Sequence, residues 1–122
     1  MTKYIYVLVD PLDGQVRYVG QTGDCRRRLA EHMSNRGGCV WGWVSGLLAI
    51  GERPRLVVVD TVVDGNAHSV EGEWISMLWK RCPLLNRKCC YPYSWVASPL
   101  LSKWSRVKSS IAQMAPERLS VR

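Results

Sequence analysis

The sequence lacks any uninterrupted apolar stretch approaching the roughly 20 residues that a membrane-spanning helix needs. It also lacks the basic start, apolar run and small-residue cleavage site of a secretory signal. Its five cysteines are odd in number and follow no CxxC spacing, which argues against a disulfide framework and against a common zinc module. We therefore expect a cytoplasmic protein with reduced thiols that neither enters nor spans a membrane.

Acidic residues are scarce in the C-terminal third of the chain. From residue 87 onward there are seven Lys or Arg and one acid, a net charge of +6, whereas the first 86 residues carry only +1. The whole chain carries +7, and such a lopsided positive charge favours a polyanionic partner. At 122 residues, with 47% hydrophobic and 22% charged residues, the chain has the size and composition of one globular domain.

Turn residues and hydrophobic spacing divide the chain into short strands and amphipathic helices. The segment Asp10–Gly14 is rich in turn-forming residues and separates two runs typical of a β-hairpin. Asp24 is a good N-cap for the helix that follows. We expect strands at 4–9, 16–19 and 55–63 and helices at 25–34, 41–48, 67–80 and 99–114. This order, ββααβα plus a C-terminal helix, predicts an α/β (α+β) protein with a three-stranded antiparallel sheet flanked by helices. We assign residues 1–90 to this domain and 91–122 to a basic, Trp-containing extension.

The hairpin and the next helix carry polar residues in a suggestive arrangement. The strands contain Tyr4-Ile5-Tyr6 and Tyr18-Val19-Gly20, and the helix carries Arg28 and His32. Because these two are four residues apart, they lie on one helical face. Each alone is ordinary, since a hairpin tyrosine usually packs, an exposed helical arginine is usually solvated and a lone histidine is usually structural.

Together these residues resemble the GIY-YIG family of endonucleases. Its two tyrosine motifs match Tyr6 and Tyr18, and Tyr4 stands in place of the first motif's glycine. The family continues with an Arg and a His on the following helix, matched by Arg28 and His32. It then has a Glu that opens a later helix, here in the segment Glu71-Gly72-Glu73-Trp74-Ile75, and an Asn after that helix. These positions match Glu71 and Asn86, so the resemblance runs in order and spacing over residues 3 to 86.

The resemblance implies a metal-dependent endonuclease that hydrolyses phosphodiester bonds in DNA. Glu71 offers a hard oxygen ligand for Mg²⁺ or Mn²⁺, and Mg²⁺ is commonly held by one or two protein carboxylates and by phosphate oxygens. Glu73 is a rival ligand, but two residues apart on a helix the carboxylates cannot face the same way. The guanidinium fork of Arg28 fits phosphate oxygens and stays charged, so it is expected to stabilise the transition state.

The remaining roles are less fixed by the sequence. A phenol becomes a useful base at neutral pH only if cations lower its pKa, and we take Tyr6 as the first choice for this base with Tyr18 next. His32 is expected to orient a tyrosine, relay its proton or bind phosphate. Asn86 is either structural, water-orienting or a loop asparagine bonded to its own backbone.

The basic tail interleaves cations with indole rings, as expected where a protein contacts phosphates and bases. The alternative is a solvated helix whose tryptophans pack on the core. The DNA-binding candidates are Arg87, Lys88, Lys103, Trp104, Arg106 and Lys108, with Trp95 nearby.

Two other classes of function compete with a nuclease. One is a non-catalytic nucleic-acid-binding module on the same fold, which the loss of Tyr6, Arg28 or Glu71 would favour. None of these is lost. The other is a zinc or redox protein using Cys82, Cys89 and Cys90, which lack both the ligand spacing and a paired histidine.

Overall fold

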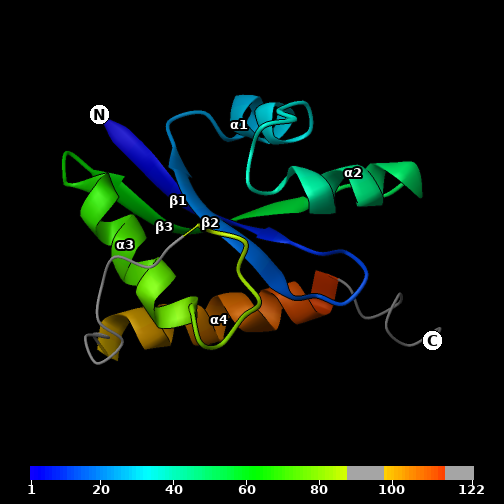
Figure 1. The fold of residues 1–122 in the computed structure, drawn as a ribbon. Helices are drawn as coiled ribbons and strands as arrows, with labels where there is room; N and C mark the ends of the chain where they lie inside the picture. Colours follow the sequence, from blue (N-terminus) through cyan, green and yellow to red (C-terminus); the bar gives the residue numbers. More distant parts are fainter. Residues whose placement is uncertain (88–97, 115–122) are drawn as a thin grey trace.

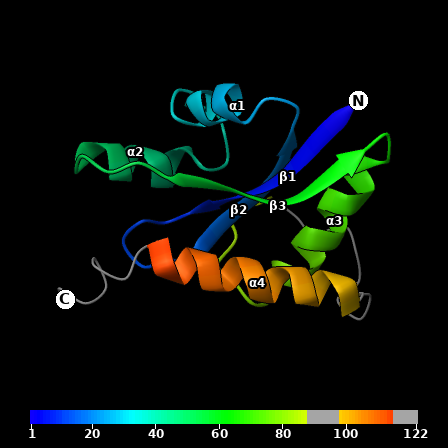
Figure 2. The ribbon, with the colours of Figure 1, turned by 180° about the vertical axis from the view of Figure 1, so that it is seen from behind.

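A three-stranded antiparallel sheet lies at the centre of the computed structural model, which describes residues 1–87 and 98–114. Its strand order is β2-β1-β3, and helices lie on both of its faces (Figures 1 and 2). The elements are β1 (Thr2–Val9), β2 (Val16–Thr22), α1 (Cys25–His32), α2 (Trp41–Ala49), β3 (Arg55–Val63), α3 (Ala67–Leu78) and α4 (Ser98–Met114). The predicted fold class and the order ββααβα are therefore confirmed.

The ends of the elements differ by at most three residues from those expected. The strand β2 runs on to Thr22, which pairs with Tyr4, and β1 begins at Thr2, which pairs with Val63 of β3. Asp24 caps α1 as predicted, accepting a hydrogen bond from the backbone N–H of Arg27. In the same way, the side chain of Asn66 caps α3. Hairpin pairing and capping thus set the ends of the elements that carry the candidate site.

The central strand β1 is covered on both faces. Residues Ile5 to Val9 are all buried, because α1 and α2 lie over one face of the sheet while α3 and α4 lie over the other (Figures 1 and 2). Side chains alternate between the faces of a strand, so Ile5 and Val7 point to the α3 side and Tyr6 points to the α1 side. The sheet therefore separates the core on the α3 side from Tyr6 and the side chains of α1.

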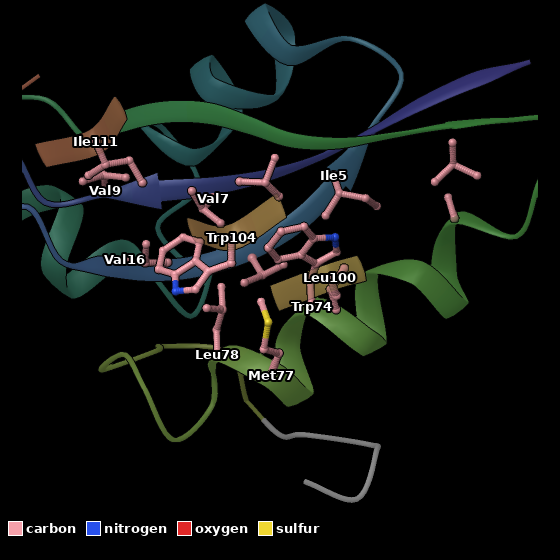
Figure 3. Close-up of a cluster of buried hydrophobic side chains, with 14 residues drawn as sticks. Ile5, Val7, Val9, Val16, Trp74, Met77, Leu78, Leu100, Trp104 and Ile111 are labelled. Carbon is pink, nitrogen blue, oxygen red and sulfur yellow. The ribbon is translucent and has the colours of Figure 1, made fainter. Parts of the chain in front are cut away.

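The core on the α3 side includes a large part of α4. Trp74 and Met77 of α3 are fully buried, and Trp104 and Ile111 of α4 pack with them against the sheet (Figure 3). The residues Leu100, Trp104, Val107 and Ile111 recur at the spacing of one helical face. The described part of the C-terminal extension thus shares its core with residues 1–87, and the boundary assigned near residue 90 does not separate two cores.

Asp60 of β3 links the sheet to both helices of this layer. Its carboxylate accepts a hydrogen bond from the indole Nε1 of Trp74 at 3.0 Å and pairs with the Lys103 Nζ at 3.0 Å. Burial raises the pKa of Asp60, but the hydrogen bonds from Trp74 and Lys103 lower it by more, so the net shift is downward. Lys103 therefore helps to dock α4.

No helix in the described part of the chain has the length and hydropathy to cross a membrane.

Candidate active site

Tyr6 lies inside the protein, directly across the hairpin from Gly20. The two residues are paired in the β1–β2 register, and the Tyr6 side chain is 0% exposed. A Cβ atom added at Gly20 would lie 2.5 Å from the Tyr6 hydroxyl and 2.9 Å from the ring of Tyr18. Because real Cβ atoms essentially never approach other atoms so closely, glycine at position 20 makes room for both tyrosine rings. The glycine of the second motif is therefore a packing requirement.

The helix α1 places a histidine against these two rings. His32 is buried, and its Nε2 lies 2.7 Å from the Tyr6 hydroxyl. Its ring also meets Tyr18 edge-on, with centroids 5.1 Å apart. His32 is the buried residue of α1, whereas the apolar residues Leu29 and Met33 are only partly buried.

Burial controls the protonation of this group. It raises the pKa of Tyr6, as does the neighbouring Tyr18, while Arg28 opposes the rise. The pKa of Tyr18 is also raised, chiefly by burial and then by Cys39. Burial and the positive charge of Arg28 lower the pKa of His32 to about 4. At neutral pH the group therefore consists of two protonated phenols and a neutral imidazole, whose Nε2 can accept a hydrogen bond from the Tyr6 hydroxyl.

Arg28 brings a permanent positive charge to the same place. It hydrogen-bonds to Tyr6 and also to Glu31, at 2.9 Å from its Nη1 to the Glu31 Oε1. Burial lowers the pKa of Arg28, but these two hydrogen bonds raise it by more, so the guanidinium stays charged. Its side chain is 33% exposed, which leaves part of the guanidinium open to solvent.

Glu71 of α3 lies near the cluster formed by Tyr6, Tyr18, Arg28 and His32. It approaches the cluster beside Gln21 of β2. It hydrogen-bonds to Gln21, interacts electrostatically with Arg28 and raises the pKa values of Tyr6 and Tyr18. Burial also raises the pKa of Glu71 itself, because its side chain is only 18% exposed. The structure thus brings Tyr6, Tyr18, Arg28, His32 and Glu71 together from four elements.

Asn86 is a structural clamp on strand β2. Its Oδ1 accepts a hydrogen bond from the Val19 N–H at 3.0 Å, and its Nδ2 donates to the Val19 carbonyl at 2.9 Å. Since β2 is at the edge of the sheet, the amide satisfies backbone groups that a further strand would otherwise pair. Asn86 therefore fixes the backbone between Tyr18 and Gly20, and the interpretation as a loop residue bonded to its own backbone is wrong.

The DNA-binding candidates of the tail fall into separate groups. Trp104 is 9% exposed and belongs to the core, so the expectation that its ring stacks on bases is wrong for this conformation. Lys103 pairs with Asp60, whereas Arg106 and Lys108 are exposed on α4. Arg87 is exposed next to Asn86, at the end of the first described segment. Lys88 and Trp95 lie outside the described residues.

Sequence reasoning missed two residues next to Glu71. Gln21 hydrogen-bonds to it, and His68 lies one helical turn before it. The position of Gln21 directly after the second motif was visible, but its contact depends on how α3 packs against β2. The spacing of His68 and Glu71 on a helix was the one signal that was available from the sequence.

Within the described residues no group of three or more His, Cys, Asp or Glu side chains could hold a metal ion. Glu71 fits a cation held mainly by water and phosphate oxygens, because it is a partly buried carboxylate at the rim of the cluster. The described cysteines Cys25, Cys39 and Cys82 are free, and Cys89 and Cys90 lie outside the described residues.

A groove among the described residues lies away from this cluster. It has a volume of about 620 Å³ and runs between the β1–β2 turn and α4, lined by Arg81, Trp104 and Lys108 among others. It is therefore on the opposite face of the sheet from α1 (Figure 1). Since phosphodiester cleavage needs only a surface that a strand of DNA can approach, this groove does not compete with the cluster as a candidate active site.

No family model matches this sequence, and no curated protein or solved structure matches it either.

Proposed function

We propose that this chain is a metal-dependent endonuclease that hydrolyses phosphodiester bonds in DNA. The observation that carries the proposal is the convergence of Tyr6, Tyr18, Arg28, His32 and Glu71 on one site. Cutting a phosphodiester requires an activated water, neutralisation of charge on the phosphoryl group and help for the leaving oxygen. This set of side chains has a group suited to each task, in the order along the chain that resembles the GIY-YIG family.

Glu71 is the proposed protein anchor for Mg²⁺, which when bound would neutralise phosphate charge and polarise the scissile bond. Arg28 is the proposed partner of the non-bridging oxygens, because its guanidinium remains charged and is partly exposed. The charge of Arg28 also opposes the burial that raises the pKa values of the two tyrosines.

Of the two phenols, Tyr18 is the better candidate for contact with the attacking water. Tyr6 was the first choice from sequence, but its side chain is 0% exposed and its hydroxyl is bonded to His32. Tyr18 is only partly buried and touches the same imidazole through its ring. In this assignment Tyr6 and His32 are positioning residues that hold Tyr18 and Arg28, and Asn86 holds the backbone of β2.

The phosphate-binding surface is proposed to follow the site side of the sheet. Arg26 on α1 and Arg87 beside Asn86 are both exposed and lie close in sequence to site residues. The exposed cations of α4, Arg106 and Lys108, lie on the opposite face (Figure 2).

The test is cleavage of supercoiled plasmid, linear duplex, branched DNA and single strands, with and without Mg²⁺. The parent is expected to cut only with the metal. Glu71→Gln is expected to bind DNA without cutting it, and Arg28→Lys to be strongly impaired, because an ammonium cannot make bidentate contact with phosphate.

A non-catalytic nucleic-acid-binding module is the second candidate. Two observations favour it: the full burial of Tyr6 and the engagement of Arg28 by Glu31. Such a module would bind DNA with an affinity that depends on salt, and it would cut none of the four substrates with Mg²⁺ or Mn²⁺. The variant Glu31→Gln, which frees Arg28, would not cut them either.

A further inference from the structure

His68 stands beside Glu71 on the first turns of α3. The Nδ1 of His68 lies 3.9 Å from the Oε1 of Glu71, which is too long for a direct hydrogen bond. The His68 side chain is 82% exposed, whereas that of Glu71 is 18% exposed. The two groups thus face each other from adjacent turns, and the exposed imidazole can rotate toward the more buried carboxylate.

This separation is close to that of two ligands on one metal ion. For metal–ligand bonds of about 2.1 Å, neighbouring ligand atoms of a six-coordinate ion lie about 3.0 Å apart. The gap between His68 and Glu71 exceeds that value by less than 1 Å. A modest change of side-chain torsion in the exposed His68 can close it, without any movement of the helix backbone.

We propose that His68 is a second protein ligand of the cation at Glu71 and that it makes the site prefer Mn²⁺ to Mg²⁺. This inference rests on the proposed metal-dependent function and specifies its cofactor.

The chemistry of an imidazole supports this preference. Mg²⁺ demands oxygen ligands and gives up its waters reluctantly, so a nitrogen donor adds little to its binding. Mn²⁺ also favours carboxylate and water, but as a first-row transition ion it binds an imidazole nitrogen more readily than Mg²⁺ does, although less strongly than the later ions of the row. Neutral imidazole also adds a ligand without adding charge, which matters where Arg28 already supplies a cation. Two protein ligands leave the other positions of the ion for water and phosphate oxygens.

The test measures metal binding without DNA, so that it does not depend on cleavage. The electron paramagnetic resonance signal of free Mn²⁺ falls as the ion binds, which gives a Kd for the parent at pH 8. His68→Ala is expected to weaken Mn²⁺ binding by about tenfold or more, and Glu71→Gln to abolish it. Glu73→Gln, which removes a carboxylate from the same helix, is the matched control and is expected to leave the Kd unchanged. Competition with Mg²⁺ is expected to show less than a threefold change in Mg²⁺ affinity in His68→Ala.

Each outcome assigns the result to one of the two proposals. An unchanged Mn²⁺ Kd in His68→Ala, with binding abolished in Glu71→Gln, would overturn the role of His68 and leave the metal-dependent nuclease standing. Equal losses of Mn²⁺ and Mg²⁺ affinity in His68→Ala would overturn the preference. Unchanged binding in both variants, or no binding by the parent, would remove the metal site itself. Circular dichroism melting of each variant establishes that the proteins compared are folded.

Discussion

The hydroxyl of Tyr6 lies 2.7 Å from the Nε2 of His32, and both side chains are buried between the sheet and α1. This contact joins two motifs that are 26 residues apart in the chain. The contact holds α1 against the β1–β2 hairpin. It thereby places Arg28, on the same helix, close to Tyr6 and Tyr18.

Gly20→Ala is expected to disrupt this arrangement. The added methyl group meets the Tyr6 hydroxyl and the Tyr18 ring, so one ring must move, at a cost of about 1–3 kcal/mol in the free energy of unfolding. Cleavage is expected to fall by at least tenfold. Gly42→Ala is the control, because a Cβ at that position on α2 meets nothing within 4 Å. Urea denaturation should show Gly42→Ala to be stabilised by about 0.5–1 kcal/mol, and equal stability of the two variants would contradict the packing argument.

Glu71→Gln is expected to lose cleavage without losing stability. Burial raises the pKa of Glu71, so the ionised carboxylate present at pH 7 opposes folding, and a neutral amide of the same shape removes that cost. The melting temperature of Glu71→Gln at pH 7 should therefore equal or exceed that of the parent. Activity and melting are measured on the same preparations. A clearly lower melting temperature would mean that Glu71 has a structural role in the charged state.

The rate of cleavage is expected to rise with pH across the neutral range. The pKa values of Tyr6 and Tyr18 are raised, so the deprotonated fraction of either phenol grows about tenfold per pH unit up to at least pH 9. The pKa of His32 is about 4, so its titration adds no inflection above pH 6. Single-turnover cleavage at saturating DNA and metal checks this. An acidic limb centred near pH 6.5 would instead assign the titrating base to an imidazole.

The stability of the fold is expected to decrease in mild acid because of His32. Its pKa is about 4 in the folded protein, below its ordinary value of 6.5, so the unfolded chain binds more protons between these values. The free energy of unfolding should fall as the pH drops from about 6.5 toward 4. In His32→Gln, which keeps a polar partner for Tyr6, this part of the pH dependence should disappear. Chemical denaturation at several pH values gives the two curves.

The salt dependence of DNA binding should locate the phosphate contacts. Replacing Arg26 and Arg87 with Gln is expected to flatten the log–log slope of affinity against salt by about 1.8, because each lost contact removes about 0.9. Replacing Arg106 and Lys108, on the other face of the sheet, is expected to leave the slope unchanged. Lys103 is excluded from both pairs because its loss would also break the contact with Asp60. Glu71→Gln protein is used throughout so that the DNA stays intact. A flatter slope for the α4 pair would place DNA across both faces.

The fold could be predicted from the sequence to a large extent because local signals agreed with one another. The cap at Asp24 and the turn at Asp10–Gly14 are short-range features, and the spacing of Trp74 with Met77 marks a buried helical face. Trp104 was misassigned because cations interleaved with indole rings are compatible with both a DNA-binding surface and a helix packed on a core. The recurrence of Leu100, Trp104, Val107 and Ile111 at helical spacing favoured the core and was the better signal.

The site could be predicted only in part. Identities and order pointed to Tyr6, Arg28 and Glu71, but burial changed their chemistry, since a fully buried phenol bonded to a neutral imidazole is a different group from one in a cleft. The contact of Gln21 with Glu71 depends on the packing of α3 against β2, which no local pattern encodes.

The packing of α4 into the core has a consequence for how the protein is made. Ribosomal synthesis delivers the sheet, Tyr6, Tyr18 and α3 before it delivers Leu100, Trp104 and Ile111, which belong to the same hydrophobic core as Trp74 and Met77. A nascent chain that ends near residue 90 holds all six motif residues but leaves that apolar surface open, so it is prone to aggregate. A fragment that ends near residue 90 has the same exposed surface, so the residues of the candidate site should be expressed together with α4.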